Sequence, residues 1–129
     1  MPKRVLDVGQ CAPDHAAIRR LVQGTFGAEV VQADRLDDAL AALRSAALRR
    51  ESFDLVLINR KLDIDYSDGI EILRAIKTDS ALASTPVMLV TNYPEHQQAA
   101  IAAGAEPGFG KAELGLAATR EKLARFLDA

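Results

Sequence analysis

The chain has 129 residues, of which 16 are basic and 18 acidic, and its formal net charge is −2. This near balance gives no electrostatic reason to expect nucleic acid or an anionic membrane as the main partner. No apolar run approaches the ~18 residues of a membrane span, and the one cysteine, Cys11, excludes an internal disulfide, so a cytoplasmic location is expected. Because no repeat or linker interrupts the chain, we expect a single domain over residues 1–129.

Short runs of branched apolar residues predict the strands. Four of them occur at residues 5–8, 29–33, 53–58 and 86–91, and a weaker fifth strand is expected near Phe109. The third and fourth runs are apolar on both faces, which is typical of central strands in a parallel sheet.

Apolar residues at helical spacing predict a helix after each strand. The first helix is expected from Asp14 to near Gly27, Asp34 is expected to cap the second, and Ser67 or Asp68 the third. Four residues of the last helix are expected to face inward: Leu116, Leu123, Phe126 and Leu127.

This alternation predicts βαβ units, a parallel sheet and right-handed crossovers. In such sheets the binding site lies beyond the carboxyl ends of the strands. The residues at these ends are Gly9-Gln10, Asn59, Thr91 and Gly110-Lys111.

Several weak motifs occur in a specific order. They are the apolar run that ends in Asn59, the dipeptide Asp68-Gly69, the run at residues 86–91, and Lys111 seven residues after Gly104. In this order they resemble the receiver domains of response regulators, and the resemblance covers essentially the whole chain. It implies a flavodoxin-like, doubly wound α/β fold, with a five-stranded parallel sheet of strand order 2-1-3-4-5 and five helices.

The resemblance also implies a phosphorylation pocket. In receivers, two acidic residues after the first strand hold Mg²⁺ beside an aspartate that attacks the phosphoryl group, and a threonine and a lysine contact that group. Here Gly9 and Gln10 stand at the acidic pair and Asn59 at the aspartate, whereas Thr91 and Lys111 match. Because Mg²⁺ requires carboxylates and an amide is no carboxylate nucleophile, we expect neither a metal, a cofactor nor a catalytic residue.

Three further departures concern the switch and the loops. Gly108 stands where receivers place an aromatic switch residue, and Ala112 stands where a proline usually follows the lysine, so a trans peptide bond is expected there. The loop at residues 60–67 is about two residues longer than in the family.

Four residues keep more than one interpretation. Asn59 replaces the phosphoacceptor or simply caps the following loop. Lys111 forms a surface salt bridge, or a hydrogen bond to the Asn59 amide or a backbone carbonyl. Asp7 interrupts an apolar strand, so it supplies a carboxylate below the pocket, with Lys111 as a possible partner, or the strand is frayed or at an edge. Cys11, four residues before His15, is a reactive thiol or a loop residue without a role.

Three classes of function follow. The first, which we favour, is a receiver-like protein-interaction module in two-component signalling that works without phosphorylation and is no enzyme. The second is a receiver that is phosphorylated elsewhere, for example at Asp63 or Asp65. The third is an unrelated flavodoxin-like enzyme or ligand binder that uses Cys11 and His15.

The expected partner is another signalling protein. In the resembling family, the fourth helix, fifth strand and fifth helix form the usual output face, here residues 94–103, 107–110 and 113–129. Gln97 and Gln98 are expected on its exposed side, which suits a partly polar interface. Docking on the first helix is the alternative, and a homodimer is compatible with the sequence.

Overall fold

The computed structural model describes residues 2–128, so residues 1 and 129 of the predicted domain lie outside the described part. Strands and helices alternate as predicted. In chain order they are β1 (Arg4–Val8), α1 (Ala12–Phe26), β2 (Glu29–Ala33), α2 (Leu36–Leu48), β3 (Leu55–Asn59), α3 (Gly69–Thr78), β4 (Val87–Val90), α4 (Pro94–Ala102), β5 (Glu106–Phe109), a 3₁₀ turn η1 (Lys111–Glu113) and α5 (Ala117–Leu127).

All five strands are parallel, and their order is β2-β1-β3-β4-β5, which confirms the predicted fold. β3 lies at the centre, and each of its five residues is buried. A strand that packs against helices on both faces needs apolar side chains on both, which is why this run shows no polar alternation.

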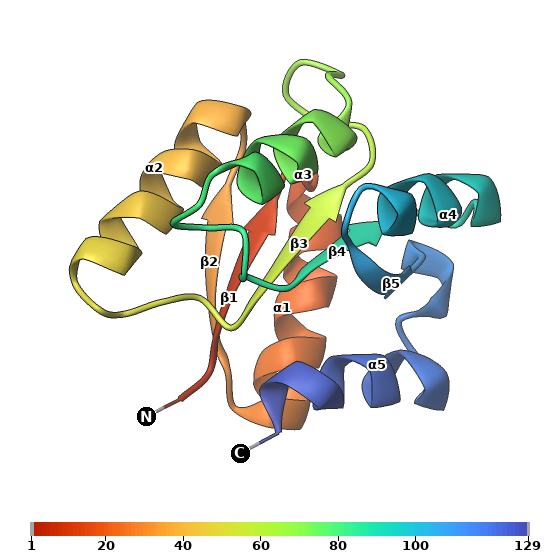
Figure 1. The fold of residues 1–129 in the computed structure, drawn as a ribbon. Coiled ribbons are helices and arrows are strands. Elements are labelled where there is room, and N and C mark those ends of the chain that lie inside the picture. The colour runs from red at the N-terminus through yellow and green to blue at the C-terminus, as the bar shows by residue number, and fades with distance from the viewer. Residues whose placement is uncertain (1, 129) are drawn as a thin grey trace.

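Helices cover both faces of the sheet (Figure 1). α1 and α5 pack on one face, where their apolar residues form a core with Leu55 and Leu57 of β3. Val56 and Ile58 of β3, together with Leu6 and Val8 of β1, point to the opposite face and pack against α2, α3 and α4. The strand period of two therefore divides the apolar residues into two cores.

Local signals set several of the helix ends. Asp68 caps α3, since its carboxylate accepts a hydrogen bond from the Ile70 amide at 3.0 Å, and of the two predicted caps it is therefore the one used. α1 ends at Gly27, whose φ of 64° is the left-handed conformation that favours glycine. Within residues 2–128, no helix is both long and apolar enough to cross a bilayer.

Three local predictions were wrong. α1 begins at Ala12, because Pro13 fits its first turn and Asp14 lies inside the helix. α2 is preceded by Arg35 rather than by a capping Asp34 side chain. Leu116, which was expected to face inward, is 50 % exposed because α5 begins only after it.

Candidate functional site

The predicted site residues lie at the carboxyl ends of the strands. Asn59 ends β3, Thr91 follows β4, and Lys111 opens the turn after β5. These three residues line one shallow cavity of about 260 Å³. Gly9 and Gln10, at the end of β1, line a different groove. The structure thus brings three of the five predicted pocket residues into one cavity and separates the other two from it.

Asn59 connects the ends of β3 and β1. Its Nδ2 donates a hydrogen bond to the Gly9 carbonyl oxygen at 3.1 Å, and its side chain is largely buried. A carboxylate has no proton to donate at neutral pH, so it would place a negative charge against this carbonyl. The amide therefore has a structural role that the aspartate of a receiver would not fulfil.

Gly9 occupies the second position at which this chain differs from receivers. Its φ of 79° lies in the left-handed region, where a side chain is strained. A Cβ atom there would overlap Cδ2 of Leu62, which is 1 % exposed and comes from the loop between β3 and α3. The next residue of that loop, Asp63, donates its amide to the Gly9 carbonyl at 2.9 Å. The loop thus packs directly on the end of β1, over the place where a side chain at position 9 would lie.

The residues at the expected metal position do not fit Mg²⁺. Gly9 has no side-chain ligand, and Asn59, whose Nδ2 donates to the Gly9 carbonyl, has an uncharged amide oxygen in place of a carboxylate. Gln10 is 3 % exposed, and neither polar atom of its amide has a hydrogen-bond partner. Mg²⁺ is bound through carboxylates, and within residues 2–128 no three His, Cys, Asp or Glu side chains are grouped so that they could hold a metal ion.

Lys111 forms an ion pair whose partner the sequence did not identify. Its Nζ lies 2.7 Å from Oδ2 of Asp14, in the first turn of α1, and both side chains are about one-third exposed. The Cys11 thiol donates to the same oxygen at 3.1 Å. The hydrogen bond from Lys111 lowers the pKa of the Asp14 carboxyl. Of the interpretations left open for Lys111, the salt bridge is therefore correct, and its partner belongs to α1.

Asp7 also finds its partner on α1. Its side chain is completely buried, and its Oδ2 lies 2.6 Å from Nδ1 of His15. Burial raises the pKa of Asp7 from an ordinary value of 3.8 to about 6, although His15 opposes this shift. Oδ1 of Asp7 has no hydrogen-bond partner among the described residues, although the Gln10 amide lies near enough to lower the pKa of this carboxyl. Asp7 therefore belongs to an intact internal strand, and the frayed-strand interpretation is wrong.

Thr91 hydrogen-bonds within its own segment. Its Oγ1 accepts a hydrogen bond from the Tyr93 amide at 3.3 Å and lies 3.5 Å from Nδ1 of His96. Tyr93 precedes α4, and His96 lies in its first turn, so Thr91 contacts the start of that helix.

Gln97 of α4 occupies the region of the missing aromatic switch. Its Nε2 donates to the Leu89 carbonyl at 2.8 Å, and its Oε1 accepts from the Gly108 amide at 3.0 Å. The amide thus bridges β4 and β5 where their pairing is irregular. A Cβ at Gly108 would overlap the Leu89 carbonyl oxygen and approach Gln97, so this geometry requires glycine. Gln97 was expected on an exposed face, and that prediction was wrong because its side chain points into the sheet edge.

Three residues that shape the site were missed from the sequence. Leu62 was one apolar residue in a loop, and nothing in its neighbours indicated where it packs. Asp14 could have been found, because it lies one turn after the end of β1 and so close to the strand ends. Gln97 was expected on the exposed side of its helix, and nothing in its neighbours indicated that its amide would bridge two strands. The trans peptide bond predicted between Lys111 and Ala112 is confirmed.

Comparisons with known proteins give the family. The family model of the response regulator receiver domain matches residues 11–112, which include Asn59, Thr91 and Lys111 but not Gly9 and Gln10. No match was found among curated proteins.

Solved structures of receiver proteins share the fold. The chemotaxis protein CheY4 of Vibrio cholerae has a TM-score of 0.73 and 23 % identity, covering 98 % of this chain and 100 % of that one. The signal receiver domain of a DNA-binding response regulator from Colwellia psychrerythraea has a TM-score of 0.75 and 21 % identity, covering 95 % and 96 %. A variant of the receiver domain of the histidine kinase CKI1 from Arabidopsis thaliana has a TM-score of 0.75 and 23 % identity, covering 95 % and 90 %. Because the family model matches most of the sequence, the chain belongs to the response regulator receiver domain family.

Proposed function

We propose that this receiver domain works without phosphorylation, as a protein-interaction module of two-component signalling. One observation carries the proposal. The side chain at the phosphoacceptor position is the Asn59 amide, and it donates a hydrogen bond to the Gly9 carbonyl.

The chemistry of phosphoryl transfer supports this proposal. A carboxylate oxygen must attack the phosphorus while a metal neutralises the phosphoryl oxygens. Asn59 offers an uncharged amide, and Leu62 lies where a metal ligand at position 9 would need space. Lys111, the cation that would meet the phosphoryl group, is paired with Asp14. The residues present therefore supply neither a carboxylate nucleophile at position 59 nor a carboxylate ligand for the metal at positions 9 and 10, and the lysine has another partner.

The contacts within the α4–β5–α5 output face also support the proposal. In a phosphorylated receiver, this face must change shape when the phosphoryl group arrives. Here the Gln97 amide joins α4 to β4 and β5, and Lys122 of α5 donates to the Gly108 carbonyl at 2.9 Å. A face that is held in one shape needs no phosphoryl trigger, and its occupancy depends on the concentration and affinity of its partner.

The test of this proposal is mass spectrometry of the intact protein after incubation with acetyl phosphate and Mg²⁺. We expect no gain of a phosphoryl group, and no stabilisation against heat by beryllofluoride with Mg²⁺. A receiver that carries the acidic pair and the aspartate is the positive control. A phosphorylated product would overturn the proposal, and mapping of the modified residue would then test Asp63 and Asp65.

The position of the partner site is tested by charge substitution. Gln98 and Arg120 are exposed on α4 and α5. Gln98→Glu and Arg120→Glu should each weaken the complex with the signalling partner several-fold. The matched variants Arg19→Glu and Arg20→Glu on α1 should leave it unchanged. Loss of binding with the α1 variants alone would move the interface to α1, as the alternative prediction requires.

A further inference from the structure

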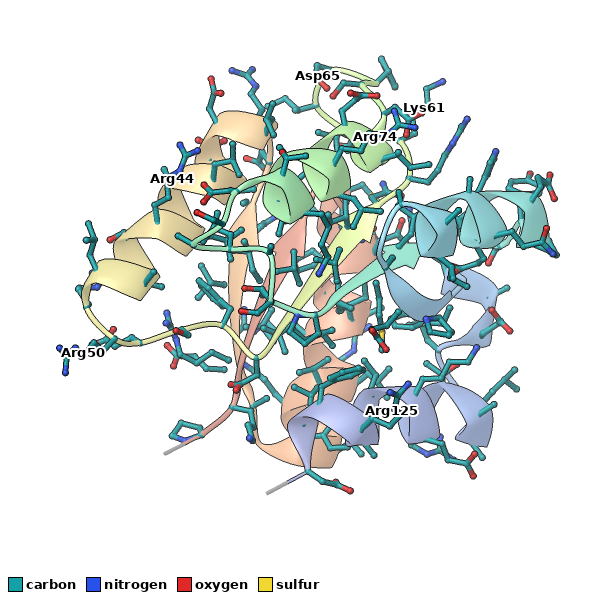
Figure 2. All side chains as sticks on the ribbon, in the orientation of Figure 1. Arg44, Arg50, Lys61, Asp65, Arg74 and Arg125 are labelled. Carbon is teal, nitrogen blue, oxygen red and sulfur yellow. The ribbon has the colours of Figure 1, made fainter. Side chains whose placement is uncertain are left out.

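The loop between β3 and α3 projects beyond the carboxyl end of the sheet (Figures 1 and 2). Lys61 and Asp68 form an antiparallel bridge at its base. Inside the loop, Tyr66 donates its amide to the Leu62 carbonyl at 2.8 Å, and Leu62 donates to the Ser67 carbonyl at 2.9 Å. With Leu62 buried and these bonds formed, the loop has a defined shape and presents the same side chains to solvent.

Two of these side chains are large and apolar. Ile64 is 47 % exposed and Tyr66 is 72 % exposed, so neither contributes much to the core. Tyr66 also has a φ of 59°, a left-handed conformation that costs a non-glycine residue on the order of 1 kcal/mol. The fold therefore maintains a strained, exposed aromatic residue beside an exposed isoleucine.

An acidic groove of about 200 Å³ adjoins the loop, next to the start of α1 and the end of β2. Ile64, Asp63 and Asp34 line it, and no basic residue does. The ion pairs within residues 2–128 include neither of these two aspartates. Gln10 also lines the groove, and both polar atoms of its buried amide lack a hydrogen-bond partner. The groove thus combines an apolar rim at Ile64 with two aspartates that form no ion pair within residues 2–128. Among the loop's own basic side chains, Lys61 lies over the Tyr66 ring, with its Nζ 5.4 Å from the ring centroid.

We propose that this loop and groove bind a basic segment of another protein. A lysine or arginine of that segment meets Asp34 and Asp63, and a neighbouring apolar side chain packs on Ile64 and Tyr66. Attraction between the basic residue and the aspartates orients the segment and speeds its association. Burial of the Tyr66 side chain at the interface adds to the affinity. A second copy of this chain fits less well, because a two-fold dimer through this groove would set its own aspartates against each other.

This surface is separate from the α4–β5–α5 face. The loop follows β3, whereas that face belongs to the opposite edge of the sheet beyond β4. The inference goes beyond the proposed function, because it neither requires that face to bind anything nor depends on the absence of phosphorylation.

The test is selection of binding peptides from a displayed random peptide library on the immobilised chain, followed by affinity measurement with the enriched peptides. We expect peptides that carry lysine or arginine beside an aromatic or aliphatic residue. Asp34→Lys with Asp63→Lys should weaken them at least tenfold, and Ile64→Ser and Tyr66→Asn should each weaken them several-fold. Asparagine is used at position 66 because it tolerates a left-handed backbone.

Two controls make the result decisive. Asp128→Lys reverses an exposed aspartate just after α5 and should leave peptide binding unchanged. Arg120→Glu changes the α4–β5–α5 face and should also leave peptide binding unchanged. Thermal unfolding shows that each variant is folded. The inference is overturned if no peptide is enriched, if the enriched peptides are acidic, or if binding is lost with Arg120→Glu but survives the loop variants. A dimer in light scattering that disappears with Tyr66→Asn would also overturn it, since the occupant would then be a second copy.

Discussion

At the carboxyl end of the sheet, Gly9 follows β1 and Asn59 ends β3, and both differ from the acidic residues of receivers. β4 and β5, in contrast, are followed by Thr91 and Lys111, which are of the types that receivers use. On the β1–β3 side the changed residues have a new structural role, because the Asn59 amide and Leu62 join the strand ends and the loop. On the β4–β5 side a familiar residue has a new partner, since Lys111 pairs with Asp14 of α1. A retained residue type therefore does not indicate a retained function unless its partners are retained too.

The largest expected effect lies at the β4–β5 edge. Gly108→Ala adds a Cβ that overlaps the Leu89 carbonyl and disturbs both hydrogen bonds of Gln97. We expect a loss of about 2 to 4 kcal/mol in the free energy of unfolding, measured by urea denaturation.

The matched control for this change is Gly24→Ala, in the interior of α1, where a Cβ meets nothing within 4 Å. It should stabilise the protein by about 0.5 to 1 kcal/mol. If both substitutions had equal effects, the Gln97 bridge would not constrain the edge.

The second prediction tests the Asp7–His15 pair on the β1–β3 side. The pKa of Asp7 is raised in the folded state from 3.8 to about 6, so the folded protein binds the proton more tightly than the unfolded chain. The raised pKa of Asp7 therefore contributes up to about 3 kcal/mol to the free energy of unfolding. This contribution is fully present below about pH 4 and is lost as the pH rises through about 6. Urea denaturation of the wild type and of Asp7→Asn at several pH values isolates this contribution, because the variant lacks the titrating group.

Lys111 and Asp14 are present in both proteins of that comparison, whereas His15 loses its carboxylate partner in Asp7→Asn. The carboxyl of Asp14 has a lowered pKa, so it contributes stability in the opposite direction as the pH rises. The difference between wild type and variant should therefore decrease with rising pH, and a flat or increasing difference would refute the assignment.

The sequence predicted the fold well and the site only in part, and the reason is physical. Strand order and layers depend on many apolar residues with the right period, so one misjudged residue, such as Leu116, changes little. The partners in the site depend on single side chains. Lys111 and Asp14 are far apart in sequence, and only the packing of α1 against the sheet brings their atoms to 2.7 Å.

A third, smaller effect concerns this ion pair. Both side chains are partly exposed to solvent, which screens their attraction. Asp14→Asn should reduce the free energy of unfolding by less than about 1 kcal/mol, and the loss should shrink in high salt. Arg74→Gln, which removes an exposed pair within α3, is the matched control. A loss of several kcal/mol for Asp14→Asn alone would show that the pair fastens α1 to the sheet far more strongly than its exposure implies.

The last prediction is that Asn59→Asp has no effect on phosphorylation: the variant should remain unphosphorylated. The new carboxylate would have the right chemistry for attack but would still lack a metal, because Gly9 and Gln10 offer no carboxylate and Leu62 lies over position 9. It would also face the Gly9 carbonyl without a proton to donate, which should cost about 1 to 3 kcal/mol of stability. The intact mass of the variant after incubation with acetyl phosphate and Mg²⁺ should therefore match that of the untreated variant.

Adding Gly9→Asp and Gln10→Asp should restore phosphorylation only together with Leu62→Ala, since the aspartate at position 9 needs the space that the leucine fills. Efficient labelling of the single variant would mean that the changed end of β1 is no obstacle to the chemistry, and the contrast between the β1–β3 side and the β4–β5 side would then reduce to one residue.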